Sequence, residues 1–137
     1  MPSKTFPYRR RRSGLFGEAR RPLVDLEAYS KTTHRWILLE DLLADTGADV
    51  SILPRRLGIL LVKDVQKGRP VPIRGVAPGA EISVFFHRVR FRFAGKEFPV
   101  LVAIADSDDV PPILGRVQGL DRFNAAFRKG RQLKLDV

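Results

Sequence analysis

One stretch of the sequence stands out, Leu42-Leu43-Ala44-Asp45-Thr46-Gly47-Ala48-Asp49-Val50-Ser51-Ile52-Leu53-Pro54. It places an aspartate, a threonine and a glycine between two hydrophobic runs. A carboxylate inside a β core costs free energy unless it is paired or has a function. Because Asp-Thr-Gly is also favourable in an ordinary β-turn, this stretch alone leaves a structural turn and a catalytic loop equally open.

A second motif lies further along the chain, Pro112-Ile113-Leu114-Gly115-Arg116. It places two large aliphatic residues before a glycine, just ahead of an amphipathic segment. In that segment Leu120, Phe123 and Phe127 recur with helical spacing, and Gly130 stands where a helix C-cap would. The pattern predicts one C-terminal helix over residues 119–129.

Elsewhere the chain alternates short apolar runs with turn residues, which is typical of a β protein. The runs predict strands over residues 23–29, 35–44, 80–93, 96–105 and 132–137, and a short helix over residues 55–62. Glu40 and Asp41 interrupt the apolar pattern of the second strand and predict a β-bulge. The apolar residues on both sides of that strand predict burial on both faces.

The 137 residues carry a formal net charge of +10. Much of the excess lies in residues 1–21, where Glu18 is the one acid beside Lys4, Arg9–Arg12, Arg20 and Arg21. Prolines and glycines disfavour regular structure there, so we expect a basic N-terminal arm over residues 1–21 and a domain over residues 22–137. Such an arm could bind nucleic acid, anionic lipid or an acidic partner, or only keep the protein in solution.

The composition also excludes several classes of site. The chain has no cysteine, which excludes disulfides, thiolate zinc sites and cysteine nucleophiles. His34 and His87 match no metal-ligand spacing, and Asp106, Asp108 and Asp109 lack the pattern of a calcium loop, so we expect neither metal nor cofactor. No apolar run is long enough to span a membrane, and none follows the basic N-terminus as in a secretory signal. We therefore expect a cytoplasmic protein.

Taken together, the motifs resemble the retropepsin-like aspartic proteases, the single-domain relatives of retroviral proteases. The resemblance covers about residues 22–137 and rests on the Asp45–Asp49 loop, a glycine-bearing hairpin around residues 74–81, and the Ile113–Arg116 motif before the expected helix. It is closer to small bacterial and archaeal members, which share the Phe6-Pro7-Tyr8 arm and the Asp108–Arg116 stretch. The resemblance implies a closed, mostly β barrel with one C-terminal helix, whose half-site is completed by homodimerisation.

The resemblance also implies a role for each residue of the loop. Asp45 would be the catalytic carboxylate, shared between two copies of the chain. Thr46 would brace the two loops across the dimer axis, and the Gly47 N–H would face the carboxylates. Ala48 and Asp49 would line the substrate cleft.

The remaining site residues would come from the two other motifs. Gly75, Val76 and Ala77 would belong to a flap over the substrate, although Pro78 removes a hydrogen-bond donor that many relatives have there. Ile113 would wall a substrate pocket. Leu114, Gly115 and Arg116 would support the site from beneath, with Arg116 paired to Asp49. Leu133, Leu135 and Val137 would interleave with the partner's terminal strands.

The activity implied is that of an aspartic endopeptidase acting on extended peptides. Two alternatives stay open. The same fold could serve as a catalytically silent dimerisation or peptide-binding module. Less in keeping with the Asp45 loop, a basic β domain could bind nucleic acid through the arginine arm and the stripe Arg88, Arg90 and Arg92.

Overall fold

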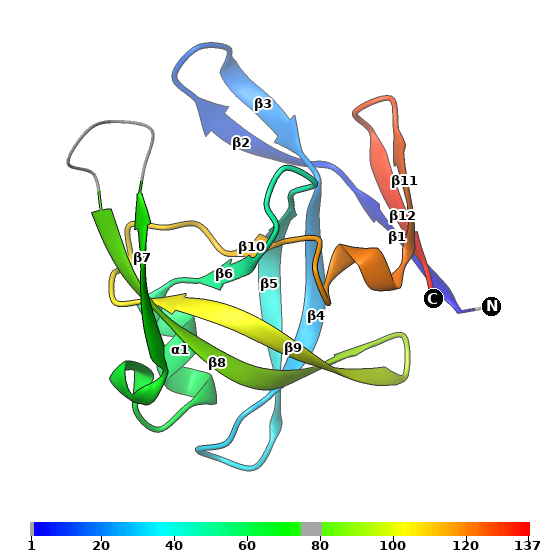
Figure 1. Ribbon diagram of the computed structural model, residues 1–137. Coiled ribbons are helices and arrows are strands. Elements are labelled where there is room, and N and C mark those ends of the chain that lie inside the picture. Colours follow the sequence, from blue (N-terminus) through cyan, green and yellow to red (C-terminus); the bar gives the residue numbers. More distant parts are fainter. Residues whose placement is uncertain (1, 75–80) are drawn as a thin grey trace.

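The computed structural model describes residues 2–74 and 81–137 (Figure 1). Its body is one seven-stranded sheet that also pairs its strands β4 and β8, which closes it into a barrel with β7 outside the closure. The mostly β, closed-barrel prediction is therefore confirmed. In spatial order the strands are β4 (Leu23–Tyr29), β5 (Trp36–Ala44), β10 (Ile113–Leu114), β6 (Ser51–Leu53), β9 (Lys96–Ala105), β8 (Glu81–Phe93) and β7 (Arg69–Arg74).

The described residues contain a single α-helix, α1 (Arg55–Leu61), which directly follows β6. Two short 3₁₀ turns accompany it in the chain, Val65–Lys67 and Leu120–Arg122. The barrel interior is filled by side chains that alternate inward along the strands. The fully buried ones include Val24, Leu39, Leu53, Val89, Phe91, Val100, Val102 and Ile104.

Strand β5 carries the predicted bulge. Glu40 and Asp41 stand opposite a single residue of β4, and Asp41 takes a positive φ of 59°. The extra residue explains why Leu39 and Leu42, three positions apart, are both buried. The expectation that β5 is buried on both faces is wrong, because the outward-facing Leu38 is more than half exposed.

The predicted C-terminal helix over residues 119–129 is also wrong. Leu120 and Phe123 do both face the interior, but they do so from a 3₁₀ turn and the residue after it. The chain then continues as strand β11 (Asn124–Arg128), in which Phe127 is largely exposed. A spacing of three between apolar residues is thus satisfied without an α-helix.

Gly130, read from the sequence as a helix cap, belongs to a hairpin turn instead. Lys129 and Gly130 both have positive φ, 50° and 67°, and the Arg131 N–H donates to the Arg128 carbonyl at 2.9 Å. Two successive residues of positive φ suit the twist of a tight β-hairpin. The turn joins β11 to the last strand, β12 (Gln132–Asp136).

The N-terminal residues are folded rather than irregular, which corrects the expectation for this segment. Strand β1 (Ser3–Pro7) pairs with β12, while β2 (Arg9–Ser13) and β3 (Gly17–Arg21) form a hairpin of their own. The helix- and strand-breaking residues fall where these strands end. Pro7 closes β1, and Gly17, at a φ of 72°, opens β3 after the turn.

Strands β1, β12 and β11 form a separate three-stranded sheet with β12 in its middle. Both edges of β12 are thus paired within the chain, and Leu133 and Leu135 are buried in the chain's own core. This arrangement contradicts the expectation that Leu133, Leu135 and Val137 interleave with a partner's strands. In the part of the chain that the structure describes, no helix has the length and apolar character needed to cross a membrane.

Candidate active site

Asp45 immediately follows β5 and lies at the start of an exposed loop. Its N–H donates to the Leu114 carbonyl at 3.0 Å, and its Oδ1 accepts the Gly47 N–H at 2.9 Å. A Cβ at position 47 would lie 3.2 Å from that same carboxylate oxygen. The glycine therefore lets the loop turn back closely on the carboxylate, which stays partly open to solvent.

The second motif lies directly beneath this loop. Strand β10 sits between β5 and β6, with Ile113 opposite Leu43 on one side and opposite Ile52 on the other. β10 lies far from β5 and β6 in the sequence, so the contact follows from the barrel topology. As a result, the Ile113–Arg116 segment supports the start and the end of the Asp45 loop together.

Gly115 is required by the closeness of this packing. A Cβ there would lie 2.5 Å from the backbone carbonyl of Val50, so any side chain would force the two segments apart. The Gly115 N–H donates to Ser51 Oγ at 3.0 Å. Ser51 is almost fully buried, and this hydrogen bond satisfies a donor that no water reaches. Sequence reasoning did not single out Ser51.

Arg116 holds the far end of the loop. Its N–H donates to the Ala48 carbonyl at 2.9 Å, and its guanidinium donates to Asp49 Oδ1 at 3.0 Å. This hydrogen bond from Arg116 to Asp49, helped by the more distant charge of Asp121, raises the pKa of Arg116. Since both side chains are well exposed, the ion pair adds little stability, and the backbone hydrogen bond does more to fix the loop.

The structure thus brings together Asp45, Thr46, Gly47, Ala48 and Asp49 with the supporting residues Ile113, Leu114, Gly115 and Arg116. Thr46, Gly47 and Asp49 are exposed, whereas Leu114 is buried. The expected flap residues Gly75, Val76 and Ala77 lie outside the described residues. The strands on either side of them, β7 and β8, pair as far as Arg74 and Glu81.

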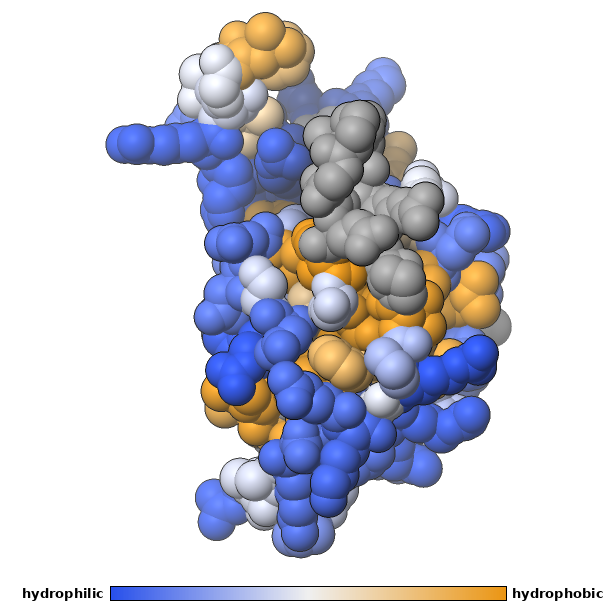
Figure 2. Space-filling model, turned by 60° about the vertical axis from the view of Figure 1, so that its left-hand side comes forward, coloured by the Kyte–Doolittle hydropathy of each residue, from blue (hydrophilic) through white to orange (hydrophobic). Residues whose placement is uncertain are grey.

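An apolar surface adjoins the loop. Six partly buried side chains pack around a buried cluster of Val84, Ala103 and Ala105, namely Val50, Ile52, Val71, Ile82, Phe86 and Val110. Figure 2 shows hydrophobic surface on the side of β7 and the start of β8, bordered by hydrophilic side chains. Two of the six residues, Val50 and Ile52, closely follow the Asp45 loop in the sequence.

A pocket of about 460 Å³ lies against β5 and was not expected from the sequence. Leu23, Leu43, Pro111 and Pro112 form its apolar part, and charged side chains surround them, with Arg11 and Arg21 from the N-terminal hairpin and Asp41 from the bulge. The pocket residue Leu43 lies two positions before Asp45 in the sequence.

Within residues 2–74 and 81–137, no three acidic or histidine side chains lie close enough together to hold a metal ion. The groups available at Asp45 are its own carboxylate and the Gly47 N–H, because the second carboxylate of the loop, Asp49, is paired with Arg116. Such a set can exchange a proton and accept hydrogen bonds, and it needs a second acid or base to activate water.

No protein-family model and no curated protein matches this sequence. Among solved structures, the chain is similar to the EIAV protease complexed with the inhibitor HBY-793, at 26% identity over 70% of this chain and 82% of that one, with a TM-score of 0.49. It is also similar to a retropepsin-like aspartic protease from Rickettsia conorii, at 20% identity with a TM-score of 0.61. That likeness covers 97% of this chain and 90% of the other.

The chain has the retropepsin-like fold. The Rickettsia likeness, which spans nearly the whole of both chains, extends to the N-terminal strands as well as to the barrel. Within this fold the chain supplies one Asp45 loop.

Proposed function

We propose that this protein is an aspartic endopeptidase that works as a homodimer, with its two Asp45 carboxylates meeting at the dimer axis. The observation that carries the proposal is the Asp45 loop itself, held by Leu114 and Gly47 in a retropepsin-like fold. A twofold axis is the ordinary symmetry of a homodimer, and it would place two identical loops face to face.

The chemistry follows from the closeness of two like carboxyl groups. Two carboxylates a few ångströms apart cannot both ionise, so they hold one proton between them. The ionised group takes a proton from a bound water, and the protonated one donates a hydrogen bond to the scissile carbonyl. Water then adds to the carbonyl carbon to give a tetrahedral diol. The C–N bond breaks as the dyad returns a proton to the leaving amine.

The positions of the residues around Asp45 suggest a role for each of them in this reaction. Thr46, exposed at the tip of the loop, would brace the partner's loop, while the Gly47 N–H orients the carboxylate. Ala48, Asp49 and Ile113 would line the cleft, and Gly75, Val76 and Ala77 would cover it from the β7–β8 hairpin.

The substrate that suits this surface is an extended peptide with hydrophobic side chains near the cleaved bond. Such a peptide can bind as an added strand between the loops of the site. The partly exposed apolar side chains after the Asp45 loop, Val50 and Ile52, give it an apolar surface to cover. The pocket beside Leu43 would take a further side chain of the same peptide.

The test is a cleavage assay at high protein concentration. Purified protein is incubated with a denatured protein mixture between about pH 4 and pH 7, the range in which a carboxyl dyad holds one proton. New peptide termini are mapped by mass spectrometry. The Asp45→Asn variant, purified in the same way and shown by thermal unfolding to be folded, is the control.

Cleavage by the wild type and none by Asp45→Asn is the result expected. Equal cleavage by both would come from a contaminating protease. If neither cleaves while the wild type sediments as a dimer, the fold serves instead as a silent dimerisation or peptide-binding module, and the enzymatic proposal is wrong.

A further inference from the structure

The β2–β3 hairpin has no role in the site described above, yet its turn carries the most exposed large apolar side chains among the residues that the structure describes. At its turn, Leu15 is 83% exposed and Phe16 is 74% exposed. In Figure 1 the hairpin rises from the barrel to the top of the molecule, and Figure 2 shows hydrophobic surface at that same height above hydrophilic side chains. Two large apolar side chains raised into solvent in this way indicate a contact with another molecule.

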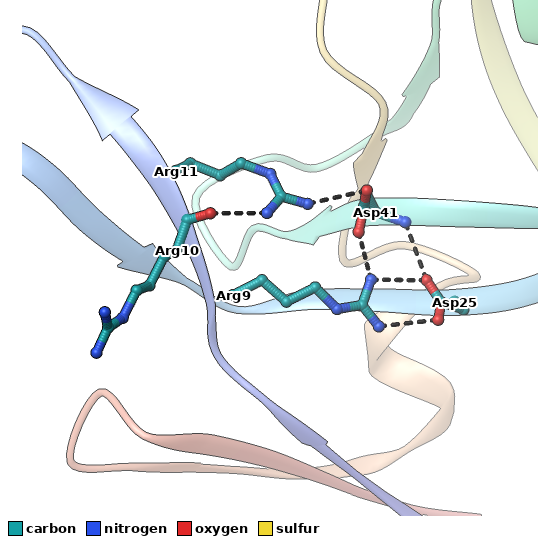
Figure 3. Close-up of polar contacts among 5 residues, drawn as sticks. All are labelled: Arg9, Arg10, Arg11, Asp25 and Asp41. Carbon is teal, nitrogen blue, oxygen red and sulfur yellow. Dashed lines mark hydrogen bonds and ion pairs between the residues drawn. The ribbon is translucent and has the colours of Figure 1, made fainter.

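A two-stranded hairpin is marginally stable by itself in water, and this one is held to the barrel by charge. Arg9 donates two hydrogen bonds to the Asp25 carboxylate, both at 2.8 Å, and also contacts Asp41 (Figure 3). Arg11 pairs with Asp41 at 2.9 Å. The Asp41 N–H in turn donates to Asp25 at 3.0 Å. The bulge in β5 thus presents one carboxylate and one N–H to the network.

This network fixes the position of the hairpin on the barrel. Arg9 and Asp25 are each less than a third exposed, so their paired hydrogen bonds are shielded from solvent and geometrically specific. They fix the start of β2 at one place on the barrel. The base of the hairpin is therefore fixed on the barrel, while Leu15 and Phe16 at its turn stay exposed to solvent.

The other end of the hairpin is attached next to the catalytic loop. β3 ends at Arg21, and the carbonyl of the following Pro22 accepts the N–H of Ala44 at 3.0 Å. Ala44 is the residue before Asp45. The hairpin thus leaves the barrel at the point where a second copy must approach if two Asp45 loops are to meet.

The terminal strands, by contrast, offer no edge of β12 to a second copy. That strand pairs with β1 from Ser3↔Asp136 to Pro7↔Gln132 and with β11 from Asn124↔Asp136 to Arg128↔Gln132. A dimer of this chain therefore needs contacts outside its C-terminal strand.

We propose that the β2–β3 hairpin is a dimer arm, whose exposed Leu15 and Phe16 pack against the second copy of this chain and hold the two Asp45 loops together. This inference rests on the proposed function, since it assumes that the site is completed by a second copy. The side chains would bury apolar area that the free chain leaves in water.

A second copy fits the hairpin better than an anionic lipid surface or a nucleic acid does. Three of its six arginines already have partners within the chain. Arg9 pairs with Asp25 of β4 and with Asp41 of the bulge. Arg11 also pairs with Asp41, and Arg10 lies 4.0 Å from Glu18. A ligand bound mainly through phosphate groups would compete with these pairs.

The experiment compares two pairs of substitutions by sedimentation velocity over a range of concentrations. Leu15→Ser/Phe16→Ser removes the apolar tip, and Ile59→Ser/Leu60→Ser removes an equally adjacent, exposed apolar pair on α1. Both are made in the Asp45→Asn background, so that association is measured apart from cleavage. Because all four side chains are exposed, both variants should fold, and their thermal unfolding is checked.

We expect the tip variant to weaken the dimer at least about tenfold, as loss of a central apolar contact does, and the α1 variant to leave the dimer unchanged. An unchanged dimer in the tip variant, or an Asp45→Asn parent that stays monomeric at every concentration, would overturn the proposal. So would binding to phosphatidylserine vesicles or RNA that the tip variant loses while its dimer persists. Because the Asp45→Asn protein cannot cleave, a failed dimer arm leaves the cleavage assay as an independent result.

Discussion

At the residue scale, the site depends on one buried hydroxyl. Ser51 Oγ accepts the Gly115 N–H beneath the Asp45 loop. In Ser51→Ala that N–H is left without a partner in the interior, and an unsatisfied buried donor costs about 1–3 kcal/mol. We therefore expect a lower free energy of unfolding by urea denaturation and, since Leu114 next to Gly115 holds Asp45, a lower rate of cleavage.

The matched control is Ser107→Ala. In the wild type the Ser107 hydroxyl accepts the Asp109 N–H in an exposed loop, where water can replace it. That change should cost less than the one at Ser51. Equal losses of stability in the two variants would mean that the Ser51 hydrogen bond does not support the site.

The sequence alone predicts most of the residues of the loop as site residues, but it does not predict the supporting role of Ser51. Asp45, Thr46 and Gly47 form a short, ordered motif, and a second motif of the same kind places Gly115 near it. Ser51 looks like any polar residue in a strand, because its importance comes from a glycine far along the chain. The same holds for Arg9, which the sequence shows as one charge in a run and the structure shows as a paired group.

At the scale of elements, the ion pairs of the β2–β3 hairpin predict a pH dependence. The hydrogen bonds from Arg9, aided by the Asp41 N–H, outweigh burial and hold the pKa of Asp25 below its ordinary value of 3.8. A carboxyl whose pKa is lowered on folding stabilises the protein above its unfolded pKa, and this stabilisation is lost as the pH falls through the folded value.

The wild type should therefore be more stable than Asp25→Asn at pH 7, and the difference should shrink at about pH 3 and below. Thermal unfolding of both proteins across this range measures it. Glu18→Gln, which removes an exposed acid 4.0 Å from Arg10, should show no comparable trend. A difference between wild type and Asp25→Asn that is the same at all pH values would contradict the role given to the Arg9 pair.

The elements differ in how well local patterns predict them. Strand β5 and its bulge follow from the apolar pattern and its interruption at Glu40 and Asp41. The segment after Gly119 is wrongly predicted as a helix, because a 3₁₀ turn followed by a hairpin also brings Leu120 and Phe123, three positions apart, to the interior. Only the pairing of β11 with β12 decides between the two, and pairing between strands is not a local property.

At the scale of the whole molecule, barrel closure depends on contacts that no single segment encodes. β8 is long enough to pair with β7, β9 and β4, and its pairing with β4 is reinforced by the Arg92–Glu27 ion pair at 2.8 Å. Arg92 also lies 4.2 Å from the ring centre of Trp36. One of the three arginines in the stripe at 88–92 thus has a structural partner, which the alternation of charges alone could not reveal.

The proposed dimer makes a prediction that only a two-chain site can satisfy. If each site needs an Asp45 from both copies, a wild-type chain paired with an Asp45→Asn chain is inactive. With free exchange of subunits, adding an equal amount of Asp45→Asn to a fixed amount of wild type leaves about half of the wild-type chains in wild-type dimers. Cleavage should therefore fall to about half, and further as more of the variant is added.

The control for this mixing experiment is Glu97→Gln, an exposed change at the start of β9. Added in the same amounts, it should raise the total cleavage, because it carries an intact Asp45 and forms active mixed dimers. Activity that is unaffected by Asp45→Asn, under conditions where subunit exchange is seen by sedimentation of labelled chains, would mean that one Asp45 is enough. The two-carboxylate mechanism would then have to be replaced by one in which a single chain activates water.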